Sequence, residues 1–415
     1  MSRLFRQRLI SFLFILIMLL LLFALGFGLS QGYYRDGLLA LQVIPVLKLK
    51  YVEPLSATRL FFTYLQKGNV PELLASLEDP YTKYLTEEEY NLLLEENKGS
   101  YGGVGIYLEY KDRELIIFKP MKNSPADRAG LMPGDRIIAI DAEPTKDMSK
   151  ELAVSKILGP PGTAVILTIK RGPEINPIIN NITLTRSLID PSIEWEIKFD
   201  PVIGKIGWIS LTQFNEKTSA DLGKALQAIT RENAAGIILD LRYNPGGLLI
   251  SAVEVASQLI KDGSELPIVS LKYRNQKEET FLAYPNPHHS LPPLVLLVNE
   301  WSASSSEIVA GAVKDLQAGI LVGNTTFGKG LVQDVIPLPT GGALYFTVAT
   351  YLTSGGNYIH KQGILPDVMV KNPEENISTN GNLDFHLQQQ IDLQQEEVAI
   401  QVLRRLIYST QKPAA

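Results

Sequence analysis

The spacing of hydrophobic positions changes along this chain, and each change predicts a boundary. Residues 33–99 place apolar side chains at helical intervals, and Thr86 with Glu89 has the spacing of a capping box. The apolar stripe consists of Leu39, Val43, Val46, Leu47 and Tyr51. A cluster of glycines between positions 99 and 105 ends this pattern, so we expect a helical segment over residues 33–99.

Residues 100–172 follow a different pattern, which predicts a compact module built mainly of strands. Apolar alternation favours strands near 104–109, 115–119 and 162–171, and a helical repeat covers 149–158. From about residue 191, short apolar runs and helical stretches mix. We expect strands near 206–209, 236–241 and 293–298 and helices over 219–231 and 248–260. This mixture predicts an α/β core with largely parallel strands.

The two ends of the chain differ from the middle. Arg3, Arg6 and Arg8 precede an apolar run over residues 9–29, which is long enough to span a bilayer. The arginines place the N-terminus in the cytoplasm and everything after the run outside it. A cleaved signal peptide is the competing interpretation, but the run is longer than a signal core, so a membrane anchor over residues 1–32 is favoured.

Beyond residue 373 the sequence becomes polar, and residues 383–408 return to helical spacing. We expect a polar linker and a helix over 373–415 that either docks on the core or supports a homo-oligomer.

Composition removes several classes of function. The 415 residues are 45% hydrophobic and 20% charged with a net charge of −5, and no basic stretch is dense enough for nucleic acid. There is no cysteine, so a disulfide framework, a thiol nucleophile and a cysteine metal site are excluded. The four histidines lack ligand spacing: His288, His289, His360 and His386. We expect no metal and no cofactor.

Two short blocks carry the candidate chemistry. Ser304 lies in the block Ser302–Ala312 and Lys329 in the block Thr326–Gln333, which together offer a hydroxyl nucleophile and an amine base without histidine. A lysine base needs a pKa of roughly 7–8 instead of about 10.4, and burial can supply such a shift. Taken singly, the first block reads equally as a helix cap and the second as a turn.

Together with their flanks, the blocks resemble the C-terminal processing (tail-specific) proteases. The resemblance covers roughly residues 35–370, because further motifs match in order and approximate spacing. They are Leu77–Leu85, Leu239–Leu249 with its Asn-Pro-Gly-Gly turn, Leu296–Glu300, Thr350–Gly356 and Gly363–Val368. Two positions depart from the family: Trp301 stands where glycine is usual, and Ser305 replaces the usual alanine. Trp301 is a candidate for lining the specificity pocket.

The resemblance implies roles for named residues. Ser304 would be the nucleophile, Lys329 the base, and Gln333 the third catalytic residue, which holds the lysine amine. Gln333 reads alternatively as a strand surface residue. The oxyanion hole would use the backbone N–H of Ser305 and one from Gly246 or Gly247.

Residues 100–172 resemble a PDZ domain, through the run Ser124–Asp141. PDZ domains bind an extended C-terminal peptide as an added strand and hold its carboxylate with backbone N–H groups. Gly103, Val104, Gly105 and Ile106 occupy the place of that loop, although these glycines read alternatively as the end of the helical segment. Side chains of the 149–158 helix (Val154, Ile157, Leu158) are candidates for the peptide pocket or for plain core.

The expected architecture is therefore a multidomain α/β (α+β) protein, and the resemblance implies a β-sandwich-like PDZ domain and a ClpP/crotonase-like core. The expected divisions are an anchor (1–32), a helical segment (33–99), a PDZ domain (100–172), a Ser-Lys protease core (173–372) and a tail (373–415). The implied function is a serine endopeptidase that cleaves near the C-terminus of exported or membrane proteins, located in the periplasm, a lumen or the cell exterior. A catalytically silent PDZ scaffold is the rival, and a tricorn-like peptide trimmer is a weaker third interpretation.

Overall fold

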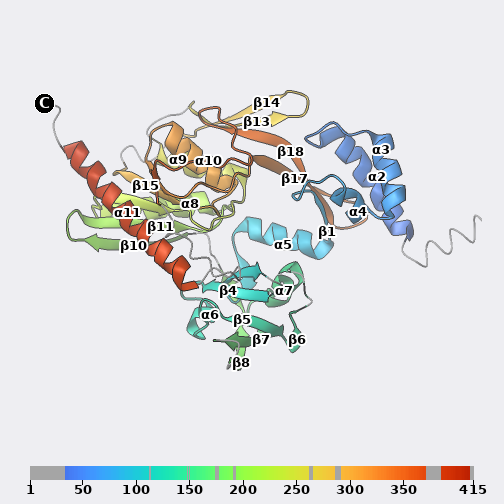
Figure 1. Cartoon of the computed structure of the whole chain (residues 1–415), viewed down its shortest axis with the longest axis horizontal. Coiled ribbons are helices and arrows are strands. Elements are labelled where there is room, and N and C mark those ends of the chain that lie inside the picture. Colours follow the sequence, from blue (N-terminus) through green and yellow to red (C-terminus); the bar gives the residue numbers. More distant parts are fainter. Residues whose placement is uncertain are drawn as a thin grey trace, which may run out of the picture. The chain divides into compact units, whose positions relative to one another are not determined.

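The computed structural model describes residues 33–111, 114–146, 148, 150–172, 177–189, 193–260, 265–285, 291–370 and 385–411 (Figure 1). The N-terminal apolar run and the pair His288–His289 lie outside these residues. The chain divides into two compact units, and each is treated by itself. The smaller unit combines the chain up to Tyr90 with Tyr273–Lys277 and Val332–Ala349. The larger unit contains the rest.

Helices dominate the smaller unit, as the stripe over residues 33–99 predicts. They are α2 (Tyr33–Lys50), α3 (Ala57–Lys67) and α4 (Val70–Ala75). Side chains of Ser56 and Asn69 cap α3 and α4 by accepting hydrogen bonds from the first turn. Val43 and Leu47 of the stripe are fully buried. They pack in one cluster with Leu344 and Phe346 of β18 (Ala343–Thr353).

Strand β1 (Lys83–Leu85) pairs antiparallel with β18, which also pairs with β17 (Leu331–Pro337). The predicted capping box is confirmed: Thr86 N donates to Glu89 Oε2 at 2.7 Å, and Glu89 N donates to Thr86 Oγ1 at 3.2 Å. Helix α5 (Glu87–Lys98) starts there because the box satisfies two amides of its first turn.

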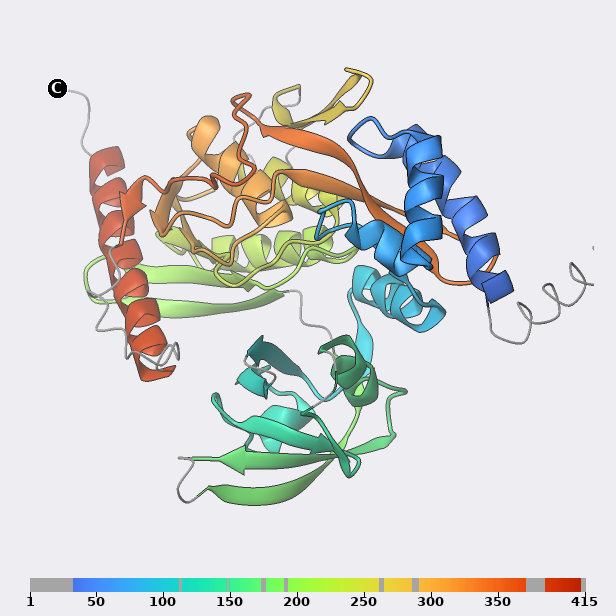
Figure 2. The same ribbon diagram turned by 45° about the vertical axis from the view of Figure 1, so that its right-hand side comes forward.

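The larger unit contains a module of strands that bears out the pattern in residues 100–172. Its sheet has the order β3-β4-β5-β7-β8, with β6 (Glu143–Pro144) paired to β5. The five strands of that order are β3 (Ile106–Lys111), β4 (Glu114–Pro120), β5 (Arg136–Ile140), β7 (Ala164–Arg171) and β8 (Ile178–Thr185). The four pairs of neighbouring strands in this order are antiparallel, and β7 and β8 lie side by side in Figure 2. Strand β3 is an edge strand.

Two short helices belong to this module, α6 (Pro125–Arg128) and α7 (Lys150–Ile157). Ala153 and Ile157 of α7 are buried in the module's core with Val104 and Ile117. A separate short ribbon joins β2 (Tyr101–Gly103) to β9 (Ser187–Ile189).

The second sheet of the larger unit has the order β10-β11-β12-β15-β16-β19. Its strands are β10 (Ile193–Asp200), β11 (Gly204–Leu211), β12 (Gly236–Asp240), β15 (Leu294–Val298), β16 (Ile320–Gly323) and β19 (Val368–Met369). Only the β10–β11 pair is antiparallel, and the other four pairs are parallel. The predicted, largely parallel α/β core is confirmed. Strands β13 (Pro267–Tyr273) and β14 (Glu278–Leu282) form an antiparallel hairpin that belongs to another sheet, in which β13 neighbours β18.

Helices cover both faces of this sheet, which explains why its strands are apolar on both faces. Helices α8 (Thr218–Arg231), α9 (Leu249–Leu259) and α10 (Ser305–Asp315) form one packed layer. Helix α11 (Phe385–Gln411) packs against β12, β15 and β16, and Figure 1 shows it in red, running across the strands. Its buried residues Ala399, Leu403 and Ile407 complete a cluster with the strands.

The tail helix therefore docks on the core, which was one of the two expectations for it. In the part of the chain that the structure describes, no helix is long and apolar enough to cross a membrane.

Candidate active site

Ser304 lies at the junction between a buried strand and a helix. It follows β15 and immediately precedes α10, with φ 54° and ψ −113°. Positive φ is unusual for a residue with a side chain and persists only when the surroundings fix it. Ser304 itself is half-buried.

The neighbouring serines Ser302 and Ser306 have different surroundings. Both are fully buried. Ser302 Oγ donates to the carbonyl oxygen of Leu241 at 2.8 Å, and Ser306 Oγ donates to that of Asn244 at 2.9 Å. These hydroxyls hold the serine loop onto the turn after β12.

Lys329 lies in the loop between β16 and β17 and is half-buried. Its neighbours leave no room for side chains: a Cβ on Gly328 would lie 2.9 Å from Gly363 N, and one on Gly330 would lie 2.8 Å from His360 N. Gly328 also has φ 86°. The two glycines therefore let the lysine loop pack directly against the backbone of residues 360–363.

Glu307, on the first turn of α10, connects the serine loop to the lysine loop. Its Oε1 accepts from Thr326 Oγ1 at 2.6 Å and from Gly328 N at 2.7 Å. Its Oε2 accepts from Ser304 N at 2.9 Å and from Lys329 N at 2.8 Å. Burial raises the pKa of this carboxyl, and the four donors oppose that rise.

This role of Glu307 is not among those predicted from the sequence. The available signal was its position at the end of the Ser-Ala-Ser-Ser-Ser-Glu run, because a glutamate at the third position of a helix reaches back to the capping residue.

The Asn-Pro-Gly-Gly turn lies against Ser304. A Cβ on Gly246 would lie 2.8 Å from Ser304 Cβ, and one on Gly247 would lie 2.0 Å from the carbonyl oxygen of Phe214. Both glycines have positive φ, 106° and 144°. Gly246 N donates to Asn244 Oδ1 at 2.9 Å, so this amide is already satisfied inside the turn.

Gly247 and Ser305 present the other two candidate amides. Gly247 is exposed, and among the described residues its N–H has no hydrogen-bond acceptor. Ser305 is the first residue of α10, where helix N–H groups have no partner inside the helix. The Ser305 hydroxyl donates to the Gly247 carbonyl oxygen at 2.9 Å, so the two residues are in direct contact.

Gln333 lies on β17, which falls in the smaller unit, whereas Ser304 and Lys329 lie in the larger one. The Gln333 Nε2 atom is buried and has no hydrogen-bond partner among the described residues. Its relation to Lys329 stays a prediction.

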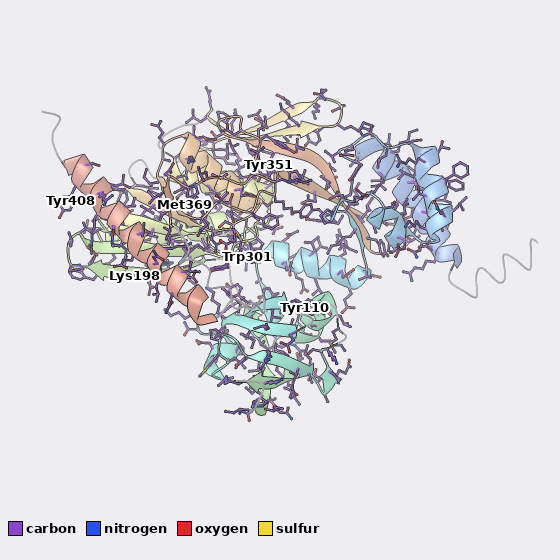
Figure 3. All side chains as sticks on the ribbon, viewed as in Figure 1. Tyr110, Lys198, Trp301, Tyr351, Met369 and Tyr408 are labelled. Carbon is purple, nitrogen blue, oxygen red and sulfur yellow. The ribbon has the colours of Figure 1, made fainter. Side chains whose placement is uncertain are left out.

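Two aromatic side chains flank the blocks. Trp301 directly precedes Ser302 and is 54% exposed, and Phe327 is 49% exposed. Figure 3 labels Trp301. Its backbone N donates to Asn299 Oδ1, which fixes the turn after β15 while the indole stays accessible.

In the strand module, the loop 103–106 joins β2 to β3. The Val104 carbonyl accepts from Ala126 N, and the Gly105 carbonyl accepts from Met121 N and Ser124 Oγ. These carbonyls are therefore satisfied inside the module. Leu158 lies next to Gly103, since a Cβ there would be 3.1 Å from Leu158 Cδ2.

The side chains of α7 and of Leu158, which directly follows it, differ in how far they are buried. Val154 and Leu158 are half-buried, whereas Ile157 belongs to the core.

Among the described residues, no group of three or more histidine, aspartate or glutamate side chains could hold a metal ion.

An α/β core with a strained serine between a strand and a helix, accompanied by a PDZ-like module, defines the class of serine peptidases with a peptide-binding domain. The model of peptidase family S41 matches residues 205–370, and the model of the PDZ domain matches residues 117–171.

Relatives agree with both matches. The chain is 38% identical to a carboxyl-terminal-processing protease of Synechocystis over 79% of this chain and 75% of the relative. It is 36% identical to the carboxy-terminal processing protease CtpA of Bacillus subtilis, over 75% of this chain and 65% of that protein. The solved photosystem II D1 C-terminal processing protease aligns with a TM-score of 0.60 at 28% identity, covering 82% of this chain and 95% of the other. The chain belongs to the carboxyl-terminal processing proteases of peptidase family S41.

Proposed function

We propose that this chain is a serine endopeptidase that recognises the C-terminal region of a protein substrate and cleaves near it by a Ser-Lys acyl-enzyme mechanism. The observation that carries the proposal is the Glu307 carboxylate, which accepts from the backbone amides of both Ser304 and Lys329. One buried side chain thus fixes the two residues that offer a nucleophile and a base.

In this mechanism Ser304 Oγ attacks the carbonyl carbon of the scissile bond while Lys329 Nζ takes its proton. The tetrahedral intermediate collapses, the C–N bond breaks, and the leaving amine receives that proton from Lys329. Water then attacks the acyl ester, again losing a proton to Lys329 Nζ. The ester bond breaks and Ser304 Oγ regains a proton from the lysine.

The oxyanion would accept hydrogen bonds from the amides of Gly247 and Ser305. Gly247 is favoured over Gly246 because the Gly246 amide already donates to Asn244 Oδ1. Removing one such donor typically lowers the rate about 100–1000-fold. Gln333 is proposed as the third catalytic residue on the family motif alone, with the role of holding the lysine amine.

The PDZ module would bind the substrate tail along β3, which is an edge strand and can pair with an extended peptide. The substrate carboxylate would meet the amides of residues 103–106, whereas two carbonyls of that loop are turned to partners inside the module. Leu158 and Val154, half-buried on the adjoining helix, would contact the last apolar side chain. Trp301 would line the specificity pocket.

We further propose that residues 1–32 anchor the chain in a membrane, with the catalytic part in the periplasm, a lumen or the cell exterior. The arginines before the apolar run support this orientation. The same division assigns 33–99 to the helical segment, 100–172 to the PDZ domain, 173–372 to the protease core and 373–415 to the tail. A homo-oligomer stays a prediction.

A quenched fluorogenic peptide assay tests the proposal. Ser304→Ala, Lys329→Ala and Lys329→Arg should each abolish cleavage, and the double Ser304→Ala/Lys329→Ala should add little, since cooperating residues are non-additive. Labelling of wild type by a fluorophosphonate, lost in Ser304→Ala, identifies the nucleophile. Tail peptides that bind the wild type without any cleavage or labelling would instead support the silent PDZ scaffold.

A further inference from the structure

The turn that carries Gly246 and Gly247 is connected to a helix about 150 residues further along the chain. Arg242 and Tyr243, the two residues before Asn244, both contact α11. Neither has a role in the mechanism above. Figure 3 labels Tyr408 of α11 and Lys198 of β10, whose Nζ lies 3.8 Å from Glu396 Oε2 of the same helix.

Arg242 is 9% exposed and binds four groups at once. Its Nε and Nη2 form a bidentate pair with Asp240 at 2.9 and 2.7 Å. Its Nη1 donates to the main-chain oxygen of Asp392 at 2.9 Å and to Gln395 Oε1 at 3.4 Å, and Nη2 donates to Glu396 at 3.0 Å. A guanidinium suits this position because its donors lie in one rigid plane.

Tyr243 has φ 62°, a strained conformation for a residue with a side chain, and it directly precedes Asn244. Two contacts hold it there. Tyr243 OH donates to Asp392 Oδ1 at 2.6 Å, and Tyr243 N donates to Asn299 Oδ1 at 3.1 Å. Asn299 also accepts from the turn that leads to Ser304, so α11 fixes one end of a chain of contacts that reaches the nucleophile.

Gln395 makes the corresponding contact at a second strand. Its Nε2 donates to Asn324 Oδ1, and Asn324 follows β16 at the start of the loop that leads to Lys329. The helix therefore contacts the carboxyl ends of β12 and β16. Active sites of parallel α/β sheets lie at these ends of the strands.

We propose that α11 is a positioning element of the active site, in which Asp392, acting on Tyr243, holds the Asn-Pro-Gly-Gly turn so that the Gly247 amide meets the oxyanion. This inference rests on the proposed peptidase function. Asp392, Gln395 and Glu396 are positioning residues, since they act on the turn through Arg242, Tyr243 and Asn324 and touch no reacting atom.

Tyr243→Phe is the most informative variant, because it removes only the hydroxyl. It keeps the ring, which lies against Phe118 with 4.8 Å between ring centroids. Asp392→Ala removes the acceptor from the other side. Each change should lower kcat about ten- to hundredfold while KM stays within about twofold, since small displacements of catalytic groups cost that much. The double variant should resemble Asp392→Ala, because that change already removes the Tyr243 bond together with an ion pair to Arg242 at 3.6 Å.

Arg404→Gln is the matched control. Arg404 also joins α11 to the sheet, through a 2.6 Å ion pair with Asp200 at the far end of β10. It should lower the melting temperature without lowering kcat. A peptidyl boronate, which mimics the tetrahedral intermediate, supplies a second measurement: its affinity should fall in parallel with kcat/KM in Tyr243→Phe and Asp392→Ala only.

Wild-type kcat in both Tyr243→Phe and Asp392→Ala would overturn the inference, as would an equal loss of kcat in Arg404→Gln. The failure of the proposed function itself looks different. In that case the wild type neither cleaves the peptide nor reacts with the fluorophosphonate, whatever residue 243 is.

Discussion

The hydroxyl of Ser305 donates a hydrogen bond of 2.9 Å to the carbonyl oxygen of Gly247. This bond joins the start of α10 to the Asn-Pro-Gly-Gly turn, the two segments that carry the proposed oxyanion donors. The resembling family usually has alanine at this position, and alanine cannot make the bond. This chain thus holds the two amides in register with one more contact than the family pattern provides.

Ser305→Ala should therefore lower kcat about two- to tenfold, because a typical buried hydrogen bond contributes about 0.5–1.5 kcal/mol. KM for a short peptide should not change. Ser409→Ala is a suitable control, since that hydroxyl bonds only within its own helix at the surface. Steady-state kinetics measure both constants. An unchanged kcat in Ser305→Ala would contradict the claim that this bond positions the two amides.

Glu307→Gln should abolish activity and lower the melting temperature. An amide can accept at one oxygen only, so its NH2 group would face two of the four donors around it. Each buried donor left without an acceptor costs about 1–3 kcal/mol. The surface variant Glu232→Gln should leave both quantities as they are. Activity of Glu307→Gln within tenfold of wild type would contradict the bridging role.

The raised pKa of Glu307 predicts opposite pH trends for activity and stability. Protonation would weaken its hold on the four donors, so kcat should fall as pH drops through this pKa, with a midpoint above the ordinary value of 4.5. The trend in stability has the opposite sign, because burial penalises the charged carboxylate more than the four donors favour it. The contribution of Glu307 to stability is therefore fully present below about pH 4.5 and is lost as the pH rises through the pKa of the folded state. Melting temperatures of wild type and Glu307→Gln, compared from pH 4 upward, should show the wild-type advantage shrinking. A constant difference would refute the assignment.

A substrate with a free C-terminal carboxylate should be cleaved faster than its amidated form, because amidation removes the charge that the loop 103–106 would hold. The difference should appear with tailed protein substrates, and short internal peptides should not respond. Deleting the whole module through β8, residues 100–185, should likewise affect tailed substrates far more than short peptides. Equal rates for the free-acid and the amidated substrate over a full concentration series would mean that the loop 103–106 does not bind the carboxylate.

The sequence predicted the elements of this fold well where periodicity is strong. The helices expected over 219–231 and 248–260 are α8 and α9, with ends shifted by one residue, because local backbone contacts decide where a helix ends. The strand expected near 293–298 is β15.

Contacts between segments far apart in the chain could not be predicted from the sequence. Nothing in the pattern around Glu307 tells which amides it accepts, and nothing near Arg242 points to Asp392 or Glu396. Such partners depend on how elements pack, and local patterns carry no information on that. Gln333 and Lys329 belong to different units, so the proposed interaction between them stays a prediction from the motif alone.

The bond between Arg242 and the main chain of Asp392 spans 150 positions, and its later partner belongs to the last described helix. Ribosomes release a chain in order, so β12, β15 and β16 emerge long before the residues that complete them. During this interval the turn after β12 lacks its support. On the positioning role proposed for α11, the turn that carries the oxyanion donors is completed only after this last described helix has been made.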